Sequence, residues 1–501
     1  MDRSRGTADL IEILGDWAGP GPLYRALAGA VRRAVLVGDL VAGDRLPAER
    51  ELARALRVSR ATVAAAYDAL RGAGVLDSRR GSGSRISAGR HGGAGADDLG
   101  RSGRAEGGGT AWGEGGTGWG EAHAGRVEGG TATALVQRLV SGSSGILSLA
   151  SAVDPGAPAV AEELAAVARE DLPGLLADAG YHPHGLPRLR EALAGHYRAA
   201  GLPTSPDQIV VTTGATQAIS LATALYLRRG SPVVVESPSW PDCLDTFRAA
   251  RARLVPVPLD GEGARVDRLA AAFGDRPALA YLMPTFHNPT GTLMSAARRR
   301  RIGELAARHG VPVLEDNAYS APLDDAPPPA PLAAYAPADA AVLTVGSLTK
   351  SVWAGLRVGW VRAPTETAGR LARLKARTDL GSPVLDQALA ARLLPRLPDL
   401  AAAGAARARL RLAHLEGLLR DRLPAWRWTP PDGGSALWVL LPDTDARVFA
   451  QVALRHGVEV VPGAATDPDG GHGSRIRIPF TLDPDVLTEL AARLARAWAD
   501  L

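Results

Sequence analysis

Lys350 lies in the segment of this chain with the most distinctive chemistry. It is one of two lysines in a protein whose Lys and Arg together number 57, so nearly every basic position is arginine. A retained lysine indicates a position that needs an amine, as a Schiff base to an aldehyde cofactor does. Ser347 and Arg357 flank it and predict a phosphate clamp. The alternative is an ordinary strand–loop–strand that contains a lysine by chance.

Two further segments could hold other parts of such a cofactor. Residues 213–217, with the sequence Thr-Gly-Ala-Thr-Gln, open a predicted helix whose free N–H groups form an anion site for a phosphate. Residues 236–241 present Trp240, whose flat face can stack on an aromatic ring. Taken singly, a tryptophan is more often part of a hydrophobic core.

Two more segments add hydrogen-bonding groups and an acid. Asn288 follows one predicted strand, and Asp316 and Tyr319 follow the next. With Lys350 these side chains predict a pyridoxal phosphate pocket, in which an aspartate keeps the pyridine nitrogen protonated. A lone aspartate at a strand end is more often a helix cap or an ion-pair partner. The order of all these groups along the chain favours the pocket.

The elements that must position these side chains alternate between short β-branched runs and longer helical patterns. The alternation predicts an open, mainly parallel α/β sheet, which binds ligands at the carboxyl ends of its strands. The candidate side chains fall at those ends. The predicted strands are 209–213, 232–236, 278–284, 311–316, 341–346 and 356–361, and the helices between them include 216–229 and 296–309.

Residues 145–501 resemble the fold-type I aminotransferases of class I/II. The resemblance implies a large domain with a mainly parallel sheet and a small α+β domain at about 379–501, with strands at 436–441 and 475–480. The strings that carry it are Tyr181-His-Pro-His-Gly, Thr212-Thr-Gly-Ala-Thr-Gln, Glu236-Ser-Pro-Ser-Trp-Pro, His287-Asn-Pro-Thr-Gly, Glu315-Asp-Asn-Ala-Tyr, Ser347-Leu-Thr-Lys, Gly355-Leu-Arg and Arg475-Ile-Arg-Ile-Pro.

The resemblance also implies a role for each candidate residue. Lys350 would form the Schiff base and Asp316 would meet the pyridine nitrogen. The other implied roles are contact with the ring hydroxyl (Asn288, Tyr319), phosphate binding (Ala215, Thr216, Ser347, Arg357), ring stacking (Trp240), contact with the partner subunit's phosphate (Tyr181) and grip on an α-carboxylate (Arg477, or Arg475 two residues earlier). Trp353-Ala354 departs from the family's usual small residue and proline before Gly-Leu-Arg, which puts the local loop shape in question.

Residues 21–88, after an N-terminal extension at 1–20, have a different pattern. Helices are predicted from residue 22, from 46 to 56 and, after an N-cap at Ser59, to 73, followed by strands at 75–76 and 85–87. Such a winged helix-turn-helix offers the start of its third helix to the major groove. The predicted DNA contacts are Arg50, Ser59, Arg60, Thr62 and, at the hairpin tip, Arg79, Arg80 and Gly81. The alternative is a small helical cap with solvated arginines.

This segment resembles the GntR family of bacterial regulators. The strings that carry the resemblance are Pro22-Leu-Tyr-Arg-Ala-Leu, Gly43-Asp-Arg-Leu-Pro-Ala-Glu-Arg-Glu-Leu-Ala, Val58-Ser-Arg-Ala-Thr-Val, Tyr67-Asp-Ala-Leu and Arg80-Gly-Ser-Gly. Residues 1–88 hold 14 basic and 10 acidic side chains, so the whole formal charge of +4 lies there. That is where a nucleic-acid surface is expected. Ala64 and Ala65 stand where relatives often carry polar groups, so base readout would rest on fewer side chains.

Residues 89–130 are rich in glycine, with no apolar period, and predict a flexible linker of on the order of 35 Å r.m.s. length. Trp112 and Trp119 within it are interpreted as incidental, with transient docking as the alternative. The single Cys243 excludes a disulfide framework and a cysteine-based metal site, and no metal is expected. No apolar run is long enough to span a membrane, and no secretory signal is visible, so a cytoplasmic protein is expected. The resemblance to bacterial DNA-binding regulators implies that it is associated with the nucleoid.

A GntR-type winged helix tethered to an aminotransferase-like domain (131–501) is the architecture of the MocR family. The resemblance implies a regulator that depends on pyridoxal 5'-phosphate, forms a head-to-tail homodimer and binds double-stranded DNA at an operator with paired half-sites. The effector would be an amino acid, an amine or pyridoxal phosphate itself, and the protein would act as a sensor and not as an enzyme, with residual or half transamination left open. The alternatives are an active aminotransferase with an appended DNA-binding module and a cofactor-free repressor.

Overall fold

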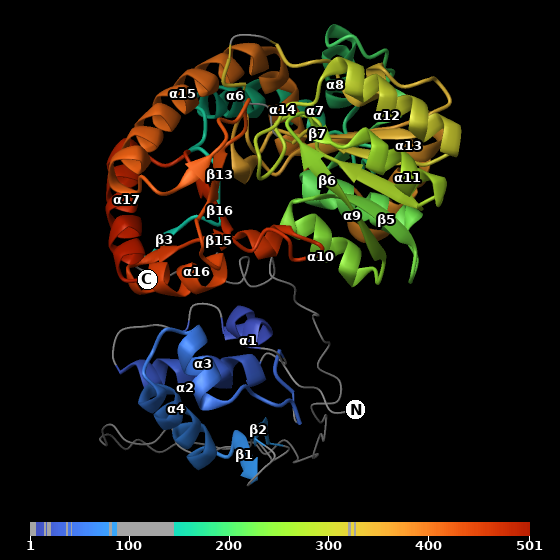
Figure 1. The fold of residues 1–501 in the computed structure, drawn as a ribbon. Coiled ribbons are helices and arrows are strands. Elements are labelled where there is room, and N and C mark those ends of the chain that lie inside the picture. Colours follow the sequence, from blue (N-terminus) through green and yellow to red (C-terminus); the bar gives the residue numbers. More distant parts are fainter. Residues whose placement is uncertain are drawn as a thin grey trace, which may run out of the picture. The chain divides into compact units, whose positions relative to one another are not determined.

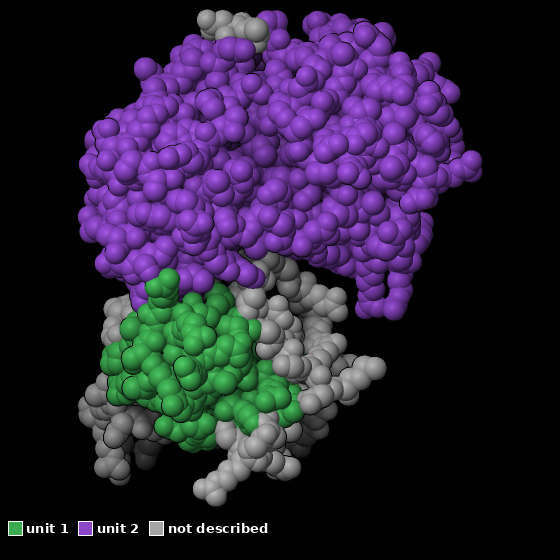
Figure 2. All heavy atoms as spheres, in the orientation of Figure 1, with its two compact units in different colours: residues 1–129 green, residues 130–501 purple. Residues whose placement is uncertain are grey.

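The computed structural model describes residues 7–14, 17, 22–36, 39–41, 43–79, 83–87, 145–318, 322–324 and 327–501. The chain divides into two compact units, residues 1–129 and 130–501, drawn in green and purple in Figure 2. The predicted linker at 89–130, with its two tryptophans, lies outside the described residues, as do Arg80, Gly81 and Tyr319. Within the described ranges, no helix is long and apolar enough to cross a membrane.

The N-terminal unit is the predicted winged helix-turn-helix. Helix α4 begins at Arg60 because the Ser59 hydroxyl accepts the N–H of Thr62 at 3.1 Å, which confirms Ser59 as the N-cap. Strands β1 and β2 pair antiparallel, with Leu76 opposite Ile86. The elements, drawn in blue in Figure 1, are α1 (Thr7–Leu14), α2 (Leu23–Leu36), α3 (Glu49–Ala55), α4 (Arg60–Gly72), β1 (Leu76–Arg79) and β2 (Gly83–Ile86).

The core of this unit extends further toward the N-terminus than the sequence indicated. Leu10, Leu14 and Trp17 are buried in the same cluster as Leu27 and Val63. The boundary predicted at residue 21 therefore cuts through the core, and part of the predicted extension belongs to the winged helix. An eight-residue helix is too short for its apolar period to stand out in the sequence.

The second unit is built on an eight-stranded sheet with the strand order β4-β11-β10-β9-β8-β5-β6-β7. Neighbouring strands from β10 through β6 run parallel, whereas β11 is antiparallel to both of its neighbours and β7 is an antiparallel edge. The strands are β4 (Ile209–Thr212), β5 (Pro232–Ser237), β6 (Arg253–Asp260), β7 (Gly263–Ala264), β8 (Leu279–Leu282), β9 (Val313–Asp316), β10 (Val342–Ser347) and β11 (Gly359–Arg362).

All six predicted strands are present, with shifts at their ends. The strand predicted from residue 356 begins only at Gly359, because Ala354–Leu356 form a 3-10 turn. Strand β6 was not predicted. It contains Pro256 and Pro258, and proline within a run argues against a strand by sequence.

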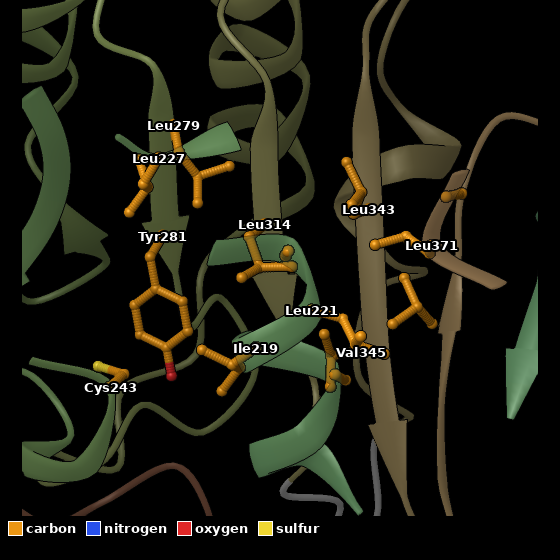
Figure 3. Close-up of a cluster of buried hydrophobic side chains, with 14 of the residues drawn as sticks. Ile219, Leu221, Leu227, Cys243, Leu279, Tyr281, Leu314, Leu343, Val345 and Leu371 are labelled. Atoms are coloured by element: carbon orange, nitrogen blue, oxygen red, sulfur yellow. The ribbon is translucent and has the colours of Figure 1, made fainter. Parts of the chain in front are cut away.

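Helices cover both faces of the sheet. On one face α9 (Ala215–Tyr226), α10 (Pro241–Ala249) and α13 (Thr365–Asp379) pack on apolar side chains of the strands. Figure 3 shows Ile219 and Leu221 of α9 beside Tyr281, Leu314 and Val345 of neighbouring strands. The other face is covered by α8 (Pro187–Ala199), α11 (Val266–Gly274), α12 (Ala296–His309) and α14 (Val384–Leu393).

The small subdomain is a four-stranded sheet of order β12-β13-β16-β15 with helices against it (Figure 1). It also uses the beginning of the unit, since β3 (Leu147–Ser148) pairs parallel with β14 (Val458–Glu459). The other elements are α15 (Leu397–Arg422), β12 (Arg427–Trp428), β13 (Ala436–Leu440), α16 (Ala446–Arg455), β15 (Val461–Pro462), β16 (Arg475–Pro479) and α17 (Pro484–Ala499).

The predicted start of the small subdomain, at about residue 379, differs from the packing. Helix α14 lies in one cluster with Leu186 and Leu189 of the large domain, so it belongs there. The first buried residues after α14 that belong to the core of the small subdomain are Leu415 and Leu419 of α15. A helix pattern alone does not tell which of two cores the helix joins.

Candidate functional site

Lys350 lies in the turn that follows β10, and its amine faces a short segment near the start of the unit. The Nζ atom donates a hydrogen bond of 2.5 Å to the carbonyl of Ala152. A cavity of about 360 Å³ lies beside it, lined also by Asp154 and Arg411. Burial, together with repulsion from Arg477, lowers the pKa of Lys350 to about 7 against the attraction of Asp154. The amine is therefore substantially neutral at physiological pH.

Asp316 ends β9 and is buried, with 4% of its surface exposed. Its Oδ2 accepts the Tyr281 hydroxyl at 2.7 Å, and its Oδ1 accepts the Ala318 N–H at 2.9 Å. Burial raises the pKa of Asp316, although both hydrogen bonds oppose the rise. A buried carboxylate is costly without a cation, and a protonated pyridine nitrogen would provide one.

The helix start predicted to bind phosphate has the required backbone. Gly214 has φ +111 and caps α9, so the N–H groups of Ala215 and Thr216 have no helical partners. Arg357 closes one side: its Nη2 donates to the Thr213 carbonyl at 2.9 Å. A Cβ added at Gly214 would lie 2.9 Å from the same guanidinium, so only glycine leaves this space open.

Ser347 and this helix start lie at the same end of the sheet, because Ser347 is opposite Gly359 of β11 and Gly359 is in turn opposite Thr212 of β4. Its hydroxyl contacts the Thr349 hydroxyl at 2.8 Å and the Val358 carbonyl at 3.3 Å. The strand ends therefore gather the four predicted phosphate ligands at one edge of the sheet.

Trp240 and Asn288 each lie on a loop that contains a cis proline. Trp240 precedes α10 and packs, partly buried, against the core, while Ser237–Pro238 is cis. Asn288 is buried, and its own bond to Pro289 is cis. His287 joins the two loops, since its Nε2 lies 3.5 Å from the Glu236 carboxylate. Burial raises the pKa of Glu236 to about 8 and lowers the pKa of His287 to about 3, so both are largely neutral near pH 7.

Arg477 and not Arg475 contacts this site. Arg477 lies on β16, is buried, and its Nη2 donates to the carbonyls of Leu149 at 3.2 Å and Ala150 at 2.7 Å. Its Nη1 lies 3.4 Å from the Asn288 amide oxygen. Lys350 and Arg477 thus hold carbonyls of one short segment, residues 149–152. Arg475 shares that face of the strand but lies two residues, about 7 Å, earlier, at the first position of β16.

One predicted residue, Tyr181, is not buried with this cluster. Tyr181 is 68% exposed in the single chain, and Tyr319 is not among the described residues. Trp353, whose position departs from the family pattern, is also exposed, and its ring lies near Gly156 and Gly355.

Three contacts at the site were not predicted. Tyr281 supports Asp316 through its hydroxyl, and the available signal was a tyrosine within an apolar strand. Asp154 attracts Lys350 from a segment far away along the chain, and Ala152 acts through its backbone, so neither gave a signal.

Of the candidate DNA-binding residues whose side chains the structure describes, Arg50, Ser59 and Arg60 are exposed and Thr62 is partly exposed. Arg60 lies 3.4 Å from Glu49 in a loose ion pair. The hydroxyls of Ser59 and Thr62 are 2.9 Å apart at the start of α4. The side chain of Arg79 is not described. Arg45 was not predicted, yet its guanidinium is beside Gly83 of the hairpin.

The second unit therefore offers an amine, a buried acid, an anion cradle and a guanidinium around one edge of the sheet. These residues fit pyridoxal phosphate: Lys350 would hold its aldehyde carbon, Asp316 its ring nitrogen, and residues 213–216 with Arg357 its phosphate. Among the described residues, no group of three or more His, Cys, Asp or Glu side chains is arranged to hold a metal ion.

Comparison with protein families assigns both units. Residues 177–494 match the aminotransferase class I and II family, and residues 23–86 match the gntR family of bacterial regulatory proteins. The chain is 29% identical to the uncharacterized HTH-type transcriptional regulator YisV of Bacillus subtilis, over 94% of this chain and 95% of that protein. It is 33% identical to the 2-aminoadipate transaminase of Thermus thermophilus, over 58% of this chain and 75% of the enzyme.

A solved structure resembles the second unit. The α-aminoadipate aminotransferase LysN of Thermus thermophilus, in complex with N-(5'-phosphopyridoxyl)-L-leucine, superposes with a TM-score of 0.66 at 30% identity. The match covers 73% of this chain and 94% of that chain.

Proposed function

Because the chain belongs to the aminotransferase class I and II family and joins that domain to a GntR-type winged helix, as MocR-type regulators do, we propose that it is a ligand-sensing transcriptional regulator. The second unit binds pyridoxal 5'-phosphate and an amino acid or amine effector, and the winged helix binds an operator in the bacterial nucleoid. The effector can change DNA affinity only by binding one conformation of the protein more tightly than another.

The observation that carries this proposal is that Lys350 and Arg477 both donate hydrogen bonds to one short backbone segment, residues 149–152, in a chain that also has a DNA-binding unit. Their hydrogen bonds to the carbonyls of Ala152 and Ala150 measure 2.5 and 2.7 Å. A bound α-amino acid needs two partners. Its amino group needs an electrophile, which the lysine would hold, and its carboxylate needs a guanidinium. Arg477 would thus orient the effector toward the position that Lys350 controls.

Pyridoxal phosphate supplies an aldehyde that accepts amines and a ring that withdraws electrons. Lys350 would present a neutral amine, since its pKa is about 7. Asp316 would hold a proton on the ring nitrogen, and Arg357 would neutralise phosphate charge. Trp240 would cover one face of the ring and exclude water.

The homodimer is also part of the proposal. Tyr181, Leu176, Leu380 and Leu385 are large apolar side chains that are 46% or more exposed in the single chain. Gly381 approaches the backbone of His182, so Leu380 and Tyr181 lie on neighbouring segments. A second copy that covered these side chains would bury apolar surface and would bring Tyr181 to the partner subunit.

The test is a DNA-binding measurement on the full-length protein with DNA from upstream of its own gene. Fluorescence anisotropy is recorded without cofactor, with pyridoxal phosphate, and with pyridoxal phosphate plus each common amino acid or amine. We expect the affinity to change severalfold with the cofactor or with one effector. Identical affinities under all conditions, in a protein that does bind the cofactor, would contradict the sensing role.

A second candidate function is a working aminotransferase, which the neutral Lys350 amine and the position of Arg477 also favour. Steady-state transamination with the common amino acids and a 2-oxo acid separates the two. Turnover in the ordinary enzymatic range of about 1–10³ s⁻¹ would support the enzyme. Under the regulator proposal, turnover is far below that range while the effector still alters DNA binding.

A further inference from the structure

Lys375 is the second lysine of the chain, and it is completely buried on α13. Its Nζ donates a hydrogen bond of 2.8 Å to Oδ1 of Asp379, one helical turn later. A buried ammonium is costly to desolvate, and packing alone would be served by an apolar side chain. The pair therefore calls for a role beyond stability.

The Asp379 carboxylate is also connected to the start of α9 by hydrogen bonds. Its Oδ2 accepts the side-chain N–H of Gln217 at 2.8 Å. The Gln217 Oε1 in turn accepts the backbone N–H of Thr213 at 2.9 Å. A carboxylate can only accept, so Asp379 determines which end of the Gln217 amide faces Thr213. Lys375 holds the carboxylate in place through its hydrogen bond to Oδ1.

Thr213 is thereby fixed on both sides. Its N–H is held by Gln217, and its carbonyl is held by Arg357 at 2.9 Å. The next residues, Gly214 to Thr216, supply the N–H groups of the anion cradle. A small rotation of the Thr213 peptide would redirect those N–H groups, because they follow it directly in the chain.

We propose that Lys375, Asp379 and Gln217 form a relay of positioning residues that sets the phosphate cradle. The inference rests on the proposed binding of pyridoxal phosphate at Lys350. The same relay fixes a second segment, since Asp379 Oδ1 also accepts the Gly381 N–H at 3.1 Å. A Cβ on Gly381 would lie 3.0 Å from the His182 nitrogen, so this loop is pressed against the residue next to Tyr181.

The test compares pyridoxal phosphate with pyridoxal, which lacks the phosphate, on the full-length protein. Dissociation constants for both are measured for wild type, Lys375→Met and Gln217→Ala by the visible absorbance that attachment at Lys350 produces. Each variant should bind pyridoxal phosphate about 10-fold more weakly and pyridoxal unchanged, the size expected for one misplaced charge-assisted hydrogen bond. Arg370→Met is the matched control, since Arg370 pairs with Glu366 on the exposed side of α13 and should change neither constant.

A purely structural ion pair predicts another result. Lys375→Met would then lower the melting temperature while the ratio of the two constants stayed at the wild-type value, and that outcome overturns the relay. If Lys375→Met does not fold, Gln217→Ala decides, because it leaves the buried ion pair intact. A wild-type protein that binds neither compound contradicts the proposed cofactor binding itself, which separates that failure from failure of the relay.

Discussion

The two units hold their candidate residues in opposite environments. In the winged helix, Arg60 has 73% of its side chain exposed and meets Glu49 only at 3.4 Å. In the aminotransferase-like unit, Asp316 and Arg477 are 4% and 6% exposed, and each is held by at least two hydrogen bonds. The contrast separates two ways of recognising a ligand.

Exposed arginines suit the binding of a large polyanion, because the summed electrostatic field of many phosphates attracts them and no single contact has to be buried. Such binding therefore depends on salt concentration. Buried charges suit a small ligand, since desolvation shifts their pKa values and makes each contact strong. Substitutions should therefore have large, specific effects in the second unit and graded, salt-dependent effects in the first.

The largest expected effect is that of Lys350→Ala. It removes the amine that holds the cofactor, so the visible absorbance of the attached cofactor should be lost completely. DNA affinity without ligands should stay within about twofold of wild type, because the DNA contacts are on the other unit. If DNA binding collapsed with the absorbance, the division of tasks between the units would be wrong.

The second largest effect is expected for the substitution Arg477→Met. Loss of a buried guanidinium that pairs with a carboxylate costs about 2–5 kcal/mol, so a carboxylate effector should bind about 100-fold more weakly. Titration of the effector against the DNA-binding response measures this. Arg475→Met, two residues earlier on the same strand, is the control and should change the effector constant little.

The pH dependence of cofactor attachment tests the burial of Lys350. The pKa of this amine is lowered to about 7, so the protonated form dominates below that pH and the reactive neutral form above it. Between about pH 6 and pH 8 the neutral fraction rises about 10-fold, and the attachment rate should rise with it. Pyridoxine phosphate has no aldehyde, so its rate of binding should not increase with pH in this way. A rate that climbs only near pH 10 would mean that the amine is solvated.

A smaller effect is expected for Arg60→Ala in the winged helix. Loss of one phosphate contact should weaken binding to all DNA sequences and reduce the slope of log affinity against log salt by about one. Arg71→Ala, at the far end of the same helix, should leave the slope unchanged. An effect of Arg60→Ala that did not depend on salt would place this arginine in base readout.

The smallest effect is expected for Ser59→Ala. The Ser59 hydroxyl accepts the Thr62 N–H, and loss of such a cap costs about 1 kcal/mol. The melting temperature of the winged helix should fall by a few degrees, while cofactor binding stays unchanged. A parallel loss of cofactor affinity would show that the two units are coupled even without DNA.

Much of the fold followed from local pattern. The six predicted strands and the Ser59 cap depend on β-branched runs and on a hydroxyl before a helix, which act within a few residues. Strand β6 did not follow, because its two prolines argue against a strand and the pairing with β5 outweighs them. Neither did the burial of α1, which depends on packing into the same core as Leu27 and Val63.

The sequence by itself determined the chemistry of this protein: a lysine among arginines, the order of strand-end residues and the motifs of both domains. Tertiary structure alone decided which groups meet. It placed Arg477 rather than Arg475 against the site, brought Ala152 to Lys350, and linked Asp379 to Gln217. Such choices depend on contacts between residues far apart in the chain, whose distances and desolvation no local pattern encodes.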